Sequence, residues 1–272
     1  MPTSYAHYKF GQEVKKRLTG ETAQIVNDYP QLFHLGLHGP DLLFYYKALK
    51  RNKVNSAGFL LHEYSGRYVF TGAAKVIREQ QMSREHQAYI YGFLCHYSLD
   101  VSCHGCVNAF DATGIAGHLE IEAELDREML VRDGKDPLCT ILTKHLVASR
   151  ENAEVIKDFF PGITAKEIEK SIKDMIFYLN FLVAPGLLKR GLIVNGLKLA
   201  GQYEKFGGLL INVQKNHACD ETVETLLDLF EDAKELAVRL IQEYPGYLKG
   251  QQELGEEYQY TFDSTLPKEG KE

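Results

Sequence analysis

The sequence predicts an all-α, multi-helix protein, and three observations lead to that prediction. Apolar residues recur every three or four positions in several long segments. Residues that can cap a helix precede two of these segments, and glycine or proline interrupts the pattern between them. The chain has 272 residues, 44% of them hydrophobic and 25% charged, which is ordinary for a globular protein with a sizeable core. We expect one compact unit.

The first expected helix begins at a capping Thr3 or Ser4 and ends at Gly20. The apolar face of this helix consists of His7, Phe10, Val14 and Leu18, so one histidine lies among apolar residues. We therefore expect His7 to face inward, where it could also be an ordinary core histidine.

The segment from Tyr29 to Tyr46 is broken at Gly39–Pro40, and Asp41 can cap the apolar stretch that follows. Asp41 is therefore expected at a turn beside the core. His62, in the stretch FLLHEYSG, is either a half-buried loop residue or a functional one.

Two buried helices are expected next, over residues 85–100 and 117–131, because both segments have apolar residues nearly all round. A turn-rich loop, VSCHGCVNAFDATGIAG, is expected between them. Residues 138–160, 164–183 and 221–244 have helical periodicity without clustered metal-binding side chains, and we interpret them as scaffold. The predicted domain is 1–247, with the metal ligands within 1–125 and the scaffold over 138–247. Residues 248–272 are predicted to be a polar, loosely held tail.

Charge and composition limit the possible partners. The formal net charge of -6 gives no basic stripe, so no long nucleic acid is expected as a partner. The start of the chain has no secretory signal pattern, and no apolar run approaches the roughly 20 residues of a membrane span. We expect a cytoplasmic protein whose five cysteines are reduced thiols. The oligomeric state is not predicted.

Two histidine–carboxylate pairs, four residues apart, suggest a metal site. His96 and Asp100 share one helix face, as do His118 and Glu122, and His104 follows Asp100 by four residues. All five are good zinc ligands in apolar surroundings, where an uncompensated polar group costs roughly 2 to 7 kcal/mol. Salt bridges between neighbouring helices are the alternative.

These motifs resemble those of the zinc-dependent phospholipases C, which are similar in fold to single-strand-specific nucleases that use three zinc ions. The resemblance covers about residues 1–130, through A-H-Y, L-H-G-P-D-L-L-F-Y-Y, L-H-E, G-F-L-C-H-Y-S-L-D and G-H-L-E-I-E. It implies a phospholipase C/nuclease-like single domain with the metal site between core helices.

The resemblance also implies a ligand set. A first zinc would lie among Asp41, His62, His96 and Asp100. A second would be held by His104, His118 and Glu122, and a third by His7 with Asp100 as a bridge. The chain has no tryptophan, which secreted relatives use at their third site, so two or three zinc ions are expected.

The expected function is zinc-dependent phosphodiester hydrolysis of the phospholipase C type, in which metal-activated water attacks phosphorus. Asp41 is the candidate catalytic carboxylate, which would assist deprotonation of that water. The expected substrate is a small phosphoester or a phospholipid headgroup. Two alternatives are a phosphoesterase or nuclease acting on nucleotides, and a non-catalytic module in which metals only staple the fold.

Several other residues are open to two interpretations. Cys103 and Cys106 form a C-x2-C pair that either packs near the metal loop or supplies a thiolate ligand. The tyrosine patches are interpreted mainly as core, with an aromatic wall for a choline-like headgroup as the alternative. The remaining N-terminal histidines are expected to be structural or to support the ligands; these are His34, His38 and His86.

Overall fold

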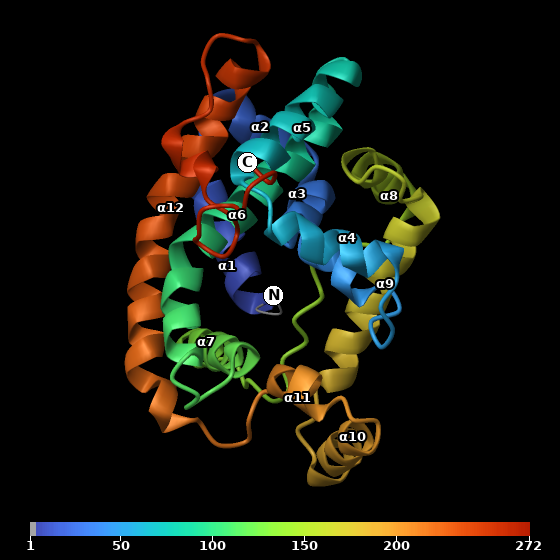
Figure 1. Ribbon diagram of the computed structural model, residues 1–272, viewed down its shortest axis with the longest axis vertical. Helices are drawn as coiled ribbons and strands as arrows, with labels where there is room; N and C mark the ends of the chain where they lie inside the picture. The colour runs from blue at the N-terminus through green and yellow to red at the C-terminus, as the bar shows by residue number, and fades with distance from the viewer. Residues whose placement is uncertain (1–3) are drawn as a thin grey trace.

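A computed structural model describes residues 4–272, apart from the side chains of residues 204 and 205 (Figure 1). Within that range the chain is helical and forms no strand beyond a single bridge between Ser65 and Thr261. The all-α prediction is confirmed. The first elements are α1 (Ser4–Arg17), α2 (Gly20–Asp28), α3 (Pro30–Gly36), the 3-10 helix η1 (Gly39–Tyr45), α4 (Lys53–His62) and α5 (Gly66–Glu79).

The centre of the molecule is α6 (Arg84–Asp111), a helix of 28 residues. It is followed by α7 (His118–Arg132), α8 (Arg150–Ile156), η2 (Lys157–Phe159) and α9 (Ala165–Leu182). The last elements are α10 (Leu187–Leu199), α11 (Tyr203–Phe206), η3 (Gly207–Leu209), η4 (His217–Cys219), α12 (Asp220–Leu248) and η5 (Glu256–Gln259). In Figure 1, α12 runs along one side of α6, and α9 with α10 lies toward the other side.

Helices α3 and α12 pack most closely against α6. The approach of α3 depends on two glycines. A Cβ on Gly36 would lie 2.1 Å from the carbonyl oxygen of Tyr89, and a Cβ on Gly92 would lie 2.1 Å from that of Phe33. No other residue type allows two helix backbones to come this close without a shift.

Three local predictions in the first half of the chain were wrong. The loop expected after residue 100 is helical as far as Asp111, because Cys103 and Val107 are buried on the packed side of α6 while Gly105 faces solvent. Burial of that side outweighs the helix-weakening glycine. The first helix ends at Arg17, and Gly20 begins α2. Asp41 lies inside η1, whose N-cap is His38. Thr3, the other proposed cap of α1, is outside the described residues.

The segment expected as one helix over residues 138–160 is helical only from Arg150 onward. Residues 138–148 form turns and extended chain in which the Asp136 carbonyl accepts hydrogen bonds from the N–H groups of Cys139 and Thr140. The helices expected over 164–183 and 221–244 are confirmed by α9 and α12.

The C-terminal segment is not loosely held, in contrast to the expectation. Tyr258 is 2% exposed and Phe262 is fully buried in the main core. The Tyr97 hydroxyl donates to the carbonyls of Glu257 and Tyr260, which anchors the segment to α6. The polar composition hides these two aromatic anchors, and so composition alone gave the wrong expectation.

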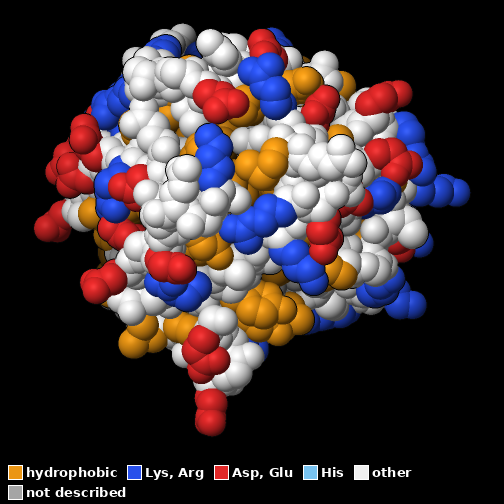
Figure 2. Space-filling model, turned by 90° about the horizontal axis from the view of Figure 1, so that it is seen from above, with side chains coloured by type: hydrophobic (Ala, Val, Ile, Leu, Met, Phe, Trp, Pro, Cys, Tyr) orange, Lys and Arg blue, Asp and Glu red, His pale blue; other side chains and the backbone are white. Residues whose placement is uncertain are grey.

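Seen from above, acidic and basic side chains are interspersed over the surface, with hydrophobic side chains in separate patches between them (Figure 2). None of the described helices combines the length and hydrophobicity that crossing a bilayer requires.

Candidate metal centre

One face of α6 carries three buried residues that can bind a metal: His96, Asp100 and His104. They follow one another at intervals of four residues, so their side chains leave the helix on the same face. Each is at most 1% exposed. Because α6 continues through the segment expected as a loop, His104 belongs to the same row as His96 and Asp100.

Four other elements bring the remaining predicted residues to this face. They are His7 on α1, Asp41 in η1, His62 at the end of α4, and His118 and Glu122 in the first turns of α7. The structure thus brings together all eight residues singled out in the sequence.

The turn into η1 depends on a glycine beside His96. Gly39 has a φ of +46°, and a Cβ at this position would lie 2.4 Å from Cδ2 of His96. Both the backbone conformation and the space therefore favour glycine. The turn lets Asp41, two residues later, reach the α6 row.

The first ligand-type group contains Asp41, His62 and His96. Oδ1 of Asp41 lies 3.0 Å from Nε2 of His62 and 3.9 Å from Nε2 of His96. Nδ1 of His62 is 2.9 Å from the carbonyl of Gly58, to which it donates. That hydrogen bond fixes the imidazole tautomer and leaves Nε2 as a lone-pair donor toward the site.

The second group contains His7, His96 and Asp100. Oδ1 of Asp100 lies 3.3 Å from Nε2 of His7, and Oδ2 lies 3.2 Å from Nε2 of His96. The two imidazole rings are stacked with their centroids 4.5 Å apart. Asp100 therefore directs one oxygen toward each histidine, which is the arrangement of a bridging carboxylate.

The third group contains His104, His118 and Glu122. Oε1 of Glu122 lies 3.0 Å from Nε2 of His118 and 3.7 Å from Nε2 of His104. Nδ1 of His104 donates to the carbonyl of Phe262 at 2.6 Å. The buried C-terminal segment thus orients one member of this group, a contact that the sequence did not suggest.

Each group offers three ligand atoms within 4.8 Å of one another. Several of these atoms are buried yet make no hydrogen bond within the described chain: Nε2 of His7, Nε2 of His96, both oxygens of Asp100 and Oε2 of Glu122. Buried polar atoms are normally hydrogen-bonded, because leaving them unpaired costs free energy. Convergent, unsatisfied donor atoms of this kind fit a divalent cation.

The electrostatics of the cluster favour ionised carboxylates. Burial alone would raise the pKa of Asp100, but His96 and His104 hold that pKa well below its usual range. Burial would likewise raise the pKa of Glu122, but hydrogen bonds from His104 and His118 lower it to about 2. Burial favours a neutral His104, but Asp100 and Glu122 raise its pKa to about 9. The centre thus attracts positive charge, as imidazole and carboxylate ligand sets for zinc do.

The other histidines have partners outside the three groups. Nε2 of His38 lies 2.8 Å from Nε2 of His145, and Nε2 of His34 lies 3.0 Å from the Gln12 amide. His86 on α6 contacts Asp158 at 3.1 Å. The expectation for these histidines allowed a structural role, and their contacts agree with one.

The two cysteines of the C-x2-C pair lie on α6 and are free thiols. Burial raises the pKa of both Cys103 and Cys106. Neither belongs to a ligand-type group among the described residues. The structure therefore favours the packing interpretation of this pair over the thiolate ligand.

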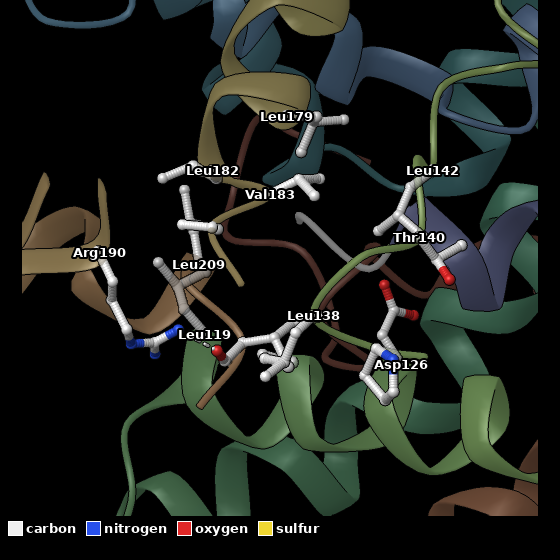
Figure 3. A pocket seen from close by; sticks show the side chains of 14 residues that line it. Leu119, Asp126, Leu138, Thr140, Leu142, Leu179, Leu182, Val183, Arg190 and Leu209 are labelled. Atoms are coloured by element: carbon white, nitrogen blue, oxygen red, sulfur yellow. Dashed lines mark hydrogen bonds between the residues drawn. The ribbon is translucent and has the colours of Figure 1, made fainter. Parts of the chain in front are cut away.

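A cleft lined by leucines has one wall on α7, the helix that carries His118 and Glu122, and the sequence did not predict it. Figure 3 shows its side chains converging on one opening, with Asp126 and Arg190 on opposite sides. Leu119, which lines it, directly follows His118 on α7. The leucine-lined cleft is formed by Leu119, Leu138, Leu142, Leu179, Leu182 and Leu209.

The family model for zinc-dependent phospholipase C matches residues 6–179, more than half of the chain. The protein belongs to the zinc-dependent phospholipase C family. Comparisons with curated proteins and with solved structures find no match.

Membership in the zinc-dependent phospholipase C family confirms the resemblance found in the motifs. All eight residues of the cluster, from His7 to Glu122, lie within the matched range. The family's metal is zinc, and the nitrogen and oxygen donors of the three groups are ligands that zinc accepts.

Proposed function

We propose that this protein is a zinc-dependent phosphodiester hydrolase of the phospholipase C type, and that the eight clustered residues hold two or three zinc ions. The observation that carries the proposal is the convergence of three ligand groups on one face of α6, in which buried atoms of His7, His96, Asp100 and Glu122 make no hydrogen bond in the described chain.

We assign the ligands by proximity. Asp41, His62, His96 and Asp100 would hold one zinc, and His104, His118 and Glu122 would hold another. His7 would share Asp100 with the first site, since the two oxygens of Asp100 face His7 and His96 separately. Zinc bound here would polarise the phosphoryl oxygens and lower the pKa of water to about 7.

The residues themselves provide orientation and a charge balance. The hydrogen bonds from His62 to Gly58 and from His104 to Phe262 hold both imidazoles in the tautomer that presents Nε2. Three carboxylates cannot neutralise two or three divalent ions, so a loaded site keeps a positive excess that attracts a phosphodiester. The His118 side chain is 29% exposed, and the site is therefore open to substrate on the α7 side.

Asp41 is the proposed catalytic carboxylate. It is 1% exposed, and its Oδ1 lies between His62 and His96. In this position it would both contribute to the metal site and accept a proton from the attacking water. An Asp41→Asn variant would retain the shape but lose the charge, and we expect it to retain less zinc and almost no activity.

Membership in the zinc-dependent phospholipase C family favours a lipid substrate over a nucleotide. The leucine-lined cleft has a volume of about 40 Å³, too small for an acyl chain, so the diacylglycerol part of the substrate would remain outside it. The proposed substrate is therefore a phospholipid whose headgroup phosphate reaches the metal centre.

The test combines metal analysis with turnover. Purified protein is expected to contain two or three zinc ions and to hydrolyse p-nitrophenylphosphorylcholine in a chelator-sensitive way, with zinc restoring activity. His96→Ala should lose zinc and activity, and His86→Ala, which changes a similarly buried histidine on the same helix, should keep both. Turnover of a nucleotide diester instead of the phosphocholine ester would reject the lipid substrate. No turnover of any phosphoester by zinc-loaded protein would reject the enzymatic function.

A further inference from the structure

Helix α10 exposes an unusual stripe of leucines. Leu188 is 81% exposed, Leu192 is 67% exposed and Leu199 is 91% exposed. They follow one another at intervals of four and seven residues, and therefore lie along one face of the helix. Exposed single leucines are common, but an aligned row on one helix is an apolar surface.

The opposite face of α10 fixes the orientation of this stripe. Ile193 is 6% exposed and packs with Ala184 and Leu210 in a small second core. The Arg190 guanidinium donates to the carbonyls of Leu210 and Ile211. The helix is thus held on its inner side, and its leucine row faces outward.

The neighbouring helix extends the apolar surface. Phe177 on α9 is 62% exposed, and Phe181, one turn later, is 47% exposed. Their rings are stacked with centroids 6.1 Å apart. The ammonium of Lys189 on α10 lies 5.5 Å from the centre of the Phe181 ring, which connects the two helices. We call Phe177, Phe181, Leu188, Leu192 and Leu199 the α9–α10 surface.

The segment that carries this surface is basic. Residues 175–203 contain no Asp or Glu, although the chain has 37 of them, and they contain Lys189, Arg190 and Lys198. On a helical projection, Lys189 and Lys198 lie on the two sides of the leucine row. An apolar row flanked by cations is typical of helices that lie in the interface of an anionic membrane.

We propose that the α9–α10 surface docks on a phospholipid bilayer that contains anionic lipid. A second copy of the chain is a poorer occupant. A two-fold contact centred on α10 would bring the lysines of both copies together, and residues 175–203 offer no acidic side chain to balance them. A bilayer supplies both the apolar interior for the leucines and the phosphates for the lysines.

Docking in this way would bring a lipid substrate to the side of the molecule that carries the leucine-lined cleft and α7. This step rests on the proposed function. Leu182 and Arg190, at the junction of α9 and α10, line the cleft, and Leu119 on α7 lines its other side. Figure 1 shows α10 at one end of the molecule, below α7 and α9. A lipid in the bilayer beneath α10 would lie on the α7 side of the molecule, where the His118 side chain is 29% exposed.

Vesicle binding tests this inference. The probe is a vesicle of phosphonate analogues of phosphatidylglycerol and phosphatidylcholine, in both of which a P–C bond replaces the scissile P–O bond, so that hydrolysis consumes neither lipid. We expect wild-type protein to co-sediment with it, and the double variant Leu188→Ser/Leu192→Ser to lose about tenfold or more in partitioning. Leu266→Ser is the matched control, because Leu266 is 66% exposed, as Leu192 is 67% exposed. Turnover of soluble p-nitrophenylphosphorylcholine should be unchanged in both variants.

Two results would overturn the membrane assignment. One is equal vesicle partitioning by wild type and the double variant. The other is a wild-type dimer in solution that the double variant converts to a monomer, which would assign the surface to a second copy. Vesicle binding that depends on Leu188 and Leu192 in a protein that hydrolyses no phosphoester would support the docking surface and reject the proposed function. The two failures are therefore distinguishable.

Discussion

The carboxylate of Asp126 on α7 accepts a hydrogen bond from the backbone N–H of Ala6 on α1, at 2.8 Å. Its other oxygen accepts the N–H of Tyr5 at 3.1 Å. N–H groups in the first turn of a helix have no partner within the helix, so a carboxylate from elsewhere can satisfy them. Asp126 thereby fixes the start of α1 immediately before His7, and helps to position this residue of the candidate metal centre.

We predict that Asp126→Ala lowers the free energy of unfolding by about 1 to 2 kcal/mol, as the loss of a helix cap does. Zinc content should also fall, because His7 loses its fixed position. Asp126→Asn keeps an acceptor oxygen and should lose less on both measures. Chemical denaturation and elemental analysis check this. Equal losses in the Asn and Ala variants would show that a single acceptor oxygen does not position α1.

The ligand groups predict different losses of zinc for different variants. In the proposed assignment Asp100 serves both the first zinc site and the site at His7, because its two oxygens face His96 and His7 separately, whereas His118 serves only the site with His104 and Glu122. Asp100→Ala should therefore remove zinc from two sites, and His118→Ala from one. Elemental analysis after gel filtration measures this, with His86→Ala as the control on α6. An Asp100→Ala protein that retained its full zinc content would refute the bridging arrangement.

Local spacing predicted the core of the candidate site but not its outer supports. His96 with Asp100, and His118 with Glu122, are recognisable because helix geometry places residues four apart on one face. The hydrogen bond from His104 to Phe262 spans 158 residues, and that from Ala6 to Asp126 spans 120. Periodicity carries no information on such distant pairs.

The errors in the predicted elements have a similar physical origin. Gly105 and the surrounding polar residues suggested a loop, but tertiary packing of Cys103 and Val107 extends α6 through them. The C-terminal tail appeared loose by composition, although two aromatic residues anchor it. The leucine row on α10 was equally hidden, because periodicity gives an apolar face without saying whether another element covers it.

Phe262 gives a prediction for the C-terminal segment. It is fully buried and its ring packs against His62 and His96, with centroids 5.2 Å and 5.9 Å away. We expect Phe262→Ala to lower the free energy of unfolding by about 3 to 5 kcal/mol, as other large core truncations do. Its zinc affinity should fall too, because the cavity loosens both imidazoles. Leu266→Ala, at an exposed site four residues later, should change stability by less than about 0.5 kcal/mol. Similar effects of the two substitutions would contradict the anchoring role of Phe262.

The pair formed by His38 and His145 predicts sensitivity to acid. Burial and the nearby His34 lower the pKa of His145 to about 3, whereas an unfolded histidine titrates near 6.5. Between these two pH values the unfolded chain binds more protons than the folded one, so stability falls as the pH falls through this window. The slope from one such group is at most about 1.4 kcal/mol per pH unit.

His145→Phe keeps a ring to stack on Tyr8, whose centroid lies 4.2 Å away, but cannot be protonated. The unfolding free energies of wild type and His145→Phe are measured by denaturation from pH 7 to pH 4, and their difference is taken at each pH. Zinc loss affects both proteins and therefore cancels in this difference. We expect this difference to shift in favour of the variant as the pH is lowered, and a constant difference would mean that His145 does not titrate on unfolding.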